Sequence, residues 1–129
     1  MGVRREEVIR RGNEWIHKPT NSRAWLEEIR TPVVGVSDEP IRQPKIHVFV
    51  PEEHRGKNIG AELLKLAVKD LEKDNFSLPK KDRVYRVFVE LSPHVHHDDL
   101  NAAIETLRKA GFSSDGSFFY YKLKNFDNP

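Results

Sequence analysis

The chain lacks cysteine altogether, and this absence excludes a disulfide framework, a thiolate zinc site and a cysteine nucleophile. It also lacks any run approaching the ~18 consecutive apolar residues of a membrane span, and its first residues lead into acids instead of the apolar segment of a signal peptide. The net charge is only +2, so charge alone does not indicate a nucleic-acid partner. We therefore expect a soluble, cytoplasmic protein with neither a membrane nor a nucleic acid as its partner.

The composition is that of a globular protein. Of the 129 residues, 37% are hydrophobic and 33% are charged, which is enough apolar material for one core and a length suited to one domain. We predict a single domain over 1–129, divided into a helical N-terminal part over 1–30 and a core over 31–129.

The first thirty residues carry apolar side chains at helical spacing. The pattern predicts an amphipathic helix over 4–16, and Trp25 and Ile29, one turn apart, predict a second short helix. Arginines interleaved with acids in the first segment are typical of a solvated helix face; they are Arg4, Arg5, Arg10 and Arg11.

The rest of the chain alternates strands and helices. The predicted strands are 33–36, 46–50, 83–92 and 118–123. The longest apolar stripe predicts a helix over 58–74, and Asp98 or Asp99 caps a further helix that ends at Gly111. The strand over 46–50 is apolar on both faces apart from His47, which is typical of an interior strand.

The segment between the 46–50 strand and the long helix carries the chemistry. A strand that leads through a glycine turn into a helix leaves backbone N–H groups pointing outward, where the helix dipole favours an anion. Gly56 and Gly60 let a phosphate approach the backbone, and Arg55 and Lys57 add positive charge. The alternative interpretation is an ordinary turn with solvated basic residues.

At these residues the sequence resembles the GNAT superfamily of acyl-CoA-dependent N-acetyltransferases. The family's apolar strand, proline and acid stretch, and arginine–glycine turn opening a helix stand here as VFVPEEHRGKNIGAELL at 48–64. A second similar stretch, NAAIETLRKAGF at 101–112, precedes a last aromatic strand. The resemblance covers residues 31–129.

The resemblance implies an α/β fold with a mixed central sheet flanked by helices, abbreviated in its N-terminal half. It implies acetyl-CoA as co-substrate and transfer of the acetyl group to an amine of a small molecule or a protein. The strand backbone would hold the pantetheine and the turn would hold the pyrophosphate. The coenzyme-binding residues so implied are Val48, Phe49, Val50, Arg55, Gly56, Lys57, Asn58, Ile59, Gly60 and Asn101.

Two positions depart from the family pattern. Asn58 stands in place of the middle glycine of the turn, and Leu107 falls where many members carry the tyrosine that protonates the departing thiolate. These departures favour the alternative of a catalytically degenerate module that binds coenzyme A or a protein partner without turnover. A histidine-dependent metal protein is a third hypothesis, and a homodimer is open in each case.

Three residues are the candidate catalytic groups. By the resemblance, Glu90 lies on the strand that borders the V-shaped opening for the acyl group, where apolar neighbours suit a general base; the alternative is a salt bridge with Arg86. Tyr120, or its neighbour Tyr121, could replace the missing tyrosine. His96 lies in a histidine-rich loop that we place at the mouth of the site as a proton relay.

Two histidine hypotheses are secondary. The loop around His96, with Asp98 and Asp99, has residue types that bind metals, but its spacing is not that of a recognised metal site, so we predict no metal. His47 is a second candidate base, although a histidine in a buried strand is more often a hydrogen-bonded core residue.

Overall fold

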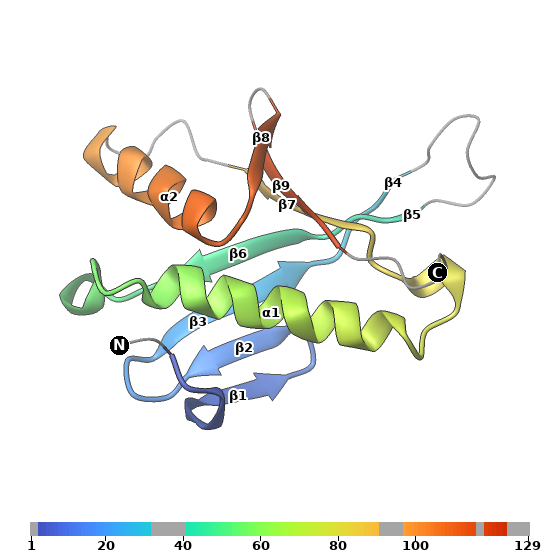
Figure 1. Cartoon of the computed structure of the whole chain (residues 1–129), viewed down its shortest axis with the longest axis horizontal. Helices are drawn as coiled ribbons and strands as arrows, with labels where there is room; N and C mark the ends of the chain where they lie inside the picture. Colours follow the sequence, from blue (N-terminus) through green and yellow to red (C-terminus); the bar gives the residue numbers. More distant parts are fainter. Residues whose placement is uncertain (1–2, 32–40, 91–96, 116–117, 124–129) are drawn as a thin grey trace.

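The protein, represented by a computed structural model, is described over residues 3–31, 41–90, 97–115 and 118–123 (Figure 1). The described residues form an α/β fold with a seven-stranded mixed sheet, a two-stranded ribbon and two helices, so the predicted α/β class is confirmed. The order in the large sheet is β1-β2-β3-β6-β7-β9-β8, and β4 pairs with β5. The elements are β1 (Val8–Arg11), β2 (Glu14–His17), β3 (Ser22–Glu27), β4 (Arg30–Thr31), β5 (Ile41–Arg42), β6 (Lys45–Phe49), α1 (Ile59–Asn75), β7 (Arg86–Glu90), α2 (His97–Lys109), β8 (Ser113–Asp115) and β9 (Phe118–Lys122).

The N-terminal part is strand, not helix, and both helices predicted there are wrong. Strands β1, β2 and β3 form an antiparallel meander, and β1 is preceded by a 3₁₀ turn at Arg5–Glu7. Arg11 pairs with Glu14 across a two-residue turn in which Gly12 has φ +59°. A glycine in that turn supplies the positive φ that short hairpins favour, so Gly12 ends a strand where we expected it within a helix.

Of the four arginines predicted on a solvated face, Arg4, Arg5 and Arg11 are exposed and Arg10 is partly buried. Arg5 pairs with Asp70 of α1 at 3.0 Å, and Arg10 pairs with Asp74 and lies 4.8 Å from the centroid of the Trp15 ring. These arginines join the N-terminal strands to α1.

The long helix is confirmed as α1 and carries the core. It lies against the meander in Figure 1, with its apolar stripe facing β2, β3 and β6. Alternate residues of the strands meet it, and Trp15, Ala24, Leu26 and Ile46 are all buried. Asn75 at its end is 3% exposed and bonds both backbone groups of Val84, which lies before β7 and not within it as expected.

The C-terminal elements follow the prediction closely. Helix α2 ends before Gly111, which has φ +92°, and β9 covers most of the predicted last strand. Strand β8 was not predicted. The strand expected over 33–36 lies outside the described residues.

The parallel pair β6–β7 positions the site. Strand β6 lies between β3 and β7, as expected for an interior strand. Its antiparallel register with β3 runs along its length, from Lys45 opposite Glu27 to Phe49 opposite Arg23. The pairing with β7 is parallel and consists of Lys45 opposite Phe88 alone among the described residues.

Candidate functional site

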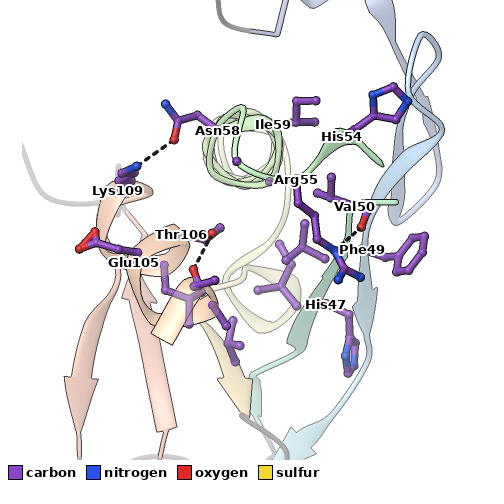
Figure 2. Close-up of a pocket in the computed structure, with 18 of the residues that line it drawn as sticks. His47, Phe49, Val50, His54, Arg55, Asn58, Ile59, Glu105, Thr106 and Lys109 are labelled. Carbon is purple, nitrogen blue, oxygen red and sulfur yellow. Dashed lines mark hydrogen bonds between the residues drawn. The ribbon is translucent and has the colours of Figure 1, made fainter. Parts of the chain in front are cut away.

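A cavity of about 780 Å³ lies between β6, the turn before α1, and α2 (Figure 2). This volume is within the range of small-molecule sites. Most of its lining side chains come from two stretches that are far apart in the chain, 46–60 and 102–109. The first helical residues of α1 and residues 102–109 of α2 form two of its walls. The cavity therefore depends on how both helices pack against the sheet.

One wall is the C-terminal part of β6. Val48 and Phe49 pair with β3 on one side of the strand, and Lys45 opposite Phe88 is the described register pair on the other side. Where an edge of a strand has no neighbouring strand, its N–H and C=O groups can pair with an amide-bearing ligand.

The turn that closes the cavity at the start of α1 uses two residues with positive φ. Gly56 has φ +84° and Asn58 has φ +62°, a left-handed conformation that asparagine tolerates better than other residues with a side chain. Asn58 is the residue before the 17-residue helix and its side chain does not cap it, so the first amides of α1 have no partner within the helix, and Ile59 and Gly60 line the cavity there.

Two cations are fixed beside this turn. Arg55 donates from Nε to the carbonyl oxygen of Val50 at 3.1 Å, and Lys109 donates from Nζ to Oδ1 of Asn58 at 2.9 Å. Figure 2 shows Lys109 reaching from α2 to Asn58 and Arg55 folded toward Val50. Both side chains therefore lie at the cavity, with Glu105 of α2 as an acidic neighbour.

Gly60 allows the close approach of α1, β6 and α2. A Cβ atom at this position would lie 3.3 Å from Cγ2 of Thr106 and 3.4 Å from Cγ2 of Val50. Contacts this short require the neighbours to move. A substitution at Gly60 would therefore alter helix packing as well as ligand access.

The cavity extends past β6 to the opposite face of the sheet. Trp25, His47 and Phe49 line it, although alternation along β3 and β6 places them on the side away from α1. Figure 2 shows His47 and Phe49 projecting from β6 away from α2. The His47 ring stacks on Trp25 with centroids 5.3 Å apart, and its Nε2 lies 3.0 Å from Oε1 of Glu27.

Eight of the ten predicted coenzyme-binding residues line this cavity. They are Val48, Phe49, Val50, Arg55, Gly56, Asn58, Ile59 and Gly60. Lys57 and Asn101 are exposed and are not among its lining residues.

Of the three predicted catalytic residues, only Tyr120 has a described side chain. Glu90 is the last residue of β7, opposite Phe118, and its side chain lies outside the described part of the structure, as does all of His96. Tyr120 pairs with Phe88 and has the Arg86 guanidinium 5.4 Å from its ring centroid. Tyr121 packs on Phe112, and burial raises the pKa of its phenol. Neither tyrosine is among the cavity-lining residues.

Several lining residues escaped the sequence analysis. Trp25 was assigned to a helix, and Glu105, Thr106 and Lys109 entered only as part of the 101–112 stretch that resembles the family, with no role assigned. The signal for the α2 residues was their i, i+3 and i+4 spacing on one helix face beside Ala102. Leu107 is 2% exposed and belongs to both the core and the cavity wall.

The described residues contain no group of three or more histidine, cysteine or acidic side chains that could hold a metal ion. The described helices include none long and apolar enough to cross a membrane.

Comparison of the chain with family models, with curated proteins and with solved structures found no match.

Proposed function

We propose that the protein binds acetyl-CoA in this cavity and transfers the acetyl group to an amine. The observation that carries the proposal is the union, in one cavity, of strand β6 with a cationic turn at the start of α1. The amides of a pantetheine arm suit the backbone of a strand, and a pyrophosphate suits the helix N-terminus with Arg55 and Lys109 beside it.

The topology supports a GNAT-like version of the α/β fold. The resemblance implies a mixed sheet with a V-shaped opening for the acyl group. The parallel pair β6–β7, with Lys45 opposite Phe88, agrees with a mixed sheet. Strands β1–β3 stand where we predicted two N-terminal helices.

The chemistry would be direct attack. The amine nitrogen forms a bond to the thioester carbonyl carbon, the carbon–sulfur bond breaks, and the electron pair leaves with the coenzyme A sulfur. Holding both reactants in one cavity supplies most of the rate. His47 is the described side chain best placed to accept the ammonium proton, because it lines the cavity and Glu27 orients its Nε2. Glu90 stays the other candidate for this role.

A second candidate function is a coenzyme A-binding module without turnover. The observation that favours it is Leu107, which puts an aliphatic side chain in the cavity wall where the family pattern has a tyrosine. Under this alternative the cavity still binds the coenzyme, so binding and turnover must be measured separately.

Thermal unfolding with and without ligand tests the proposal. A ligand that binds only the folded protein stabilises it by about 2.7 kcal/mol at one hundred times its Kd, which for this chain length is a shift of several degrees in Tm. Acetyl-CoA and free coenzyme A should both produce the shift. Absence of a shift at millimolar ligand would exclude both candidate functions, whereas a shift without release of thiol in the presence of any amine would select the second.

A further inference from the structure

The side of the sheet that faces away from α1 contributes residues to the opening of the cavity. We call the side of the large sheet that faces away from α1 the open face. Its members on β7 and β9 are the residues in register with those on β6. Its members on β1, β2, β3 and β6 are Ile9, Arg11, Glu14, Ile16, Arg23, Trp25, Glu27, Lys45, His47 and Phe49. Both described helices belong to the other side, where α1 contacts β2, β3, β6 and α2.

The centre of the open face is aromatic and partly exposed. Phe49 on β6 is 45% exposed and Ile9 on β1 is 36% exposed, and Ile16 and Arg23 lie between them in the register. The stacked Trp25 and His47 adjoin this row. Exposed apolar groups rimmed by charges are typical of interaction sites.

The cavity opens onto this aromatic centre, since Trp25, His47 and Phe49 belong to both. A molecule on the open face can therefore reach the cavity at these three residues. If the cavity binds a thioester as proposed above, the open face is where the acceptor approaches, and the inference rests on that proposed function.

The charged residues on the open face are mostly basic. Each described acid has basic neighbours: Glu27 contacts His47 and lies opposite Lys45, and Glu14 lies opposite Arg11 and 3.6 Å from Arg23. Further basic residues, the paired Arg86 and Lys122, lie on β7 and β9. Basic residues therefore outnumber the described acids on this face, and such a surface favours a lysine that is flanked by acidic residues.

We propose that the open face docks an acidic segment of another polypeptide and presents its lysine side chain to the cavity. A second copy of the chain fits less well, because a two-fold dimer through this face would bring the basic rims of identical surfaces together. Single-stranded nucleic acid also fits less well. Bases need free ring faces, and Trp25 and Tyr120 are already contacted by His47, Arg23 and Arg86.

The spacing of the strands fixes where the acids should lie. Three strand separations, about 14 Å, divide β1 from β6, and an extended peptide covers that distance in about four residues. The optimum acceptor therefore carries Asp or Glu about four residues from the lysine. In the transfer, the lysine Nζ gives its proton to the base, bonds to the acetyl carbon and displaces the coenzyme A sulfur.

Three blocked nine-residue peptides with a central lysine test the proposal. They differ only at the flanking positions, which are Glu, Gln or Arg, and n-butylamine serves as an acceptor too small to reach the rim. We expect kcat/KM to fall from the Glu to the Gln to the Arg peptide, with roughly a tenfold difference between the extremes that shrinks in high salt.

Charge reversal on the rim gives the matched comparison. The double variant Arg11→Glu, Arg86→Glu should reverse the order of the Glu and Arg peptides while leaving the n-butylamine rate and the acetyl-CoA melting shift unchanged. The control is Lys65→Glu, Lys69→Glu, which changes the net charge equally at exposed positions of α1. It should leave the order of the peptides as in the parent.

Binding of fluorescein-labelled peptides, followed by anisotropy, separates this inference from the proposed function. Failure of acetyl-CoA to bind would overturn the proposed function, and the docking surface would then stand only if the Glu peptide still binds through Arg11 and Arg86. Equal affinity for all three peptides would overturn the inference. So would tighter binding of an oligothymidylate of matched charge, or a dimer by light scattering that Trp25→Ala dissociates.

Discussion

At the scale of single residues, buried polar side chains hold the described elements together. Asp70 is 7% exposed and accepts a hydrogen bond from Nε1 of Trp15 at 2.7 Å, and Arg5 lies beside it. His17 is 5% exposed, and its Nδ1 lies 2.7 Å from the Thr20 hydroxyl. Each such group links segments distant in sequence or closes a turn, because a buried polar atom needs a partner to offset its desolvation.

Asn75 should be the most sensitive of these residues. Its side-chain amide donates to the Val84 carbonyl oxygen at 2.9 Å and accepts from the Val84 N–H at 3.0 Å. Asn75→Ala leaves two buried backbone groups without partners and should lower the free energy of unfolding by about 2–4 kcal/mol, measured in urea. Ser77→Ala, at an exposed position nearby, should cost much less. Equal costs would contradict this role for Asn75.

The proposed transfer reaction also makes a prediction about single residues. His47→Gln removes the proposed proton acceptor and should lower turnover roughly 10²–10⁴-fold while the acetyl-CoA melting shift is unchanged. Glu27→Gln should lower turnover less, because it removes only the group that orients the ring. If Glu90→Gln abolishes turnover and His47→Gln does not, the base is Glu90.

One carboxylate should make stability depend on pH. Hydrogen bonds from Arg42 hold the pKa of Glu28 below its ordinary value, so Glu28 stabilises the fold when ionised. This contribution is present above the unfolded-state pKa, about 4.3, and is lost as the pH falls through the lower folded-state pKa. The free energy of unfolding of Glu28→Gln should therefore decline less steeply than that of the parent in this acid range. Parallel curves for parent and variant would show that the ion pair does not contribute.

At the scale of elements, the turn before α1 combines local backbone geometry with contacts from α2. Asn58 supplies a left-handed backbone and accepts a hydrogen bond from Lys109. The Cβ position of Gly60 lies against Thr106 of α2. The conformation of the chain at the start of α1 therefore depends on contacts with α2 as well as on the local sequence.

Two substitutions at Asn58 separate backbone conformation from side-chain contact. Asn58→Gly keeps the positive φ at no steric cost, so it should unfold at nearly the parent temperature and keep the acetyl-CoA shift. Asn58→Val places a β-branched residue at φ +62°, which should cost about 1–2 kcal/mol and weaken the shift. The measurement is thermal unfolding of both variants with and without ligand, and identical behaviour of the two would mean that the left-handed turn is not required.

At the scale of the whole molecule, the cavity joins the C-terminal half to the N-terminal meander. Its walls come from β6, the turn, α1 and α2, while β1 and β2 contribute no residue to it. A bound ligand would therefore tie α2 to the rest of the sheet.

Hydrogen exchange should reveal this connection. On adding acetyl-CoA, amide protection should rise in 46–60 and 102–109 and should change little in β1 and β2, because a ligand slows exchange most where it suppresses local opening. The comparison is made by mass spectrometry of the parent and of Asn58→Val. A uniform rise along the chain would indicate global stabilisation without a ligand at this cavity.

The elements that the sequence alone determined are those with local hydrogen bonds or local turn chemistry. Helix α1 closes its own backbone bonds, and its apolar stripe from Ile59 to Leu71 is long enough to identify it without knowledge of its partners. The glycine-rich turn at its start and the glycine after α2 were found for the same reason, since their positive φ depends on a few neighbouring residues.

Only the tertiary structure decided the N-terminal strands and the cavity. Residues 8–17 place apolar side chains on both faces of two four-residue strands, and such a pattern also matches a helix until cross-strand partners select between them. The cavity arises where β6, the turn before α1 and α2 come together, so Trp25 of β3, Val48 of β6 and Thr106 of α2 reach it from three different elements. These contacts join residues far apart in the chain, and no local pattern specifies them because their energies depend on how the whole sheet and both helices pack.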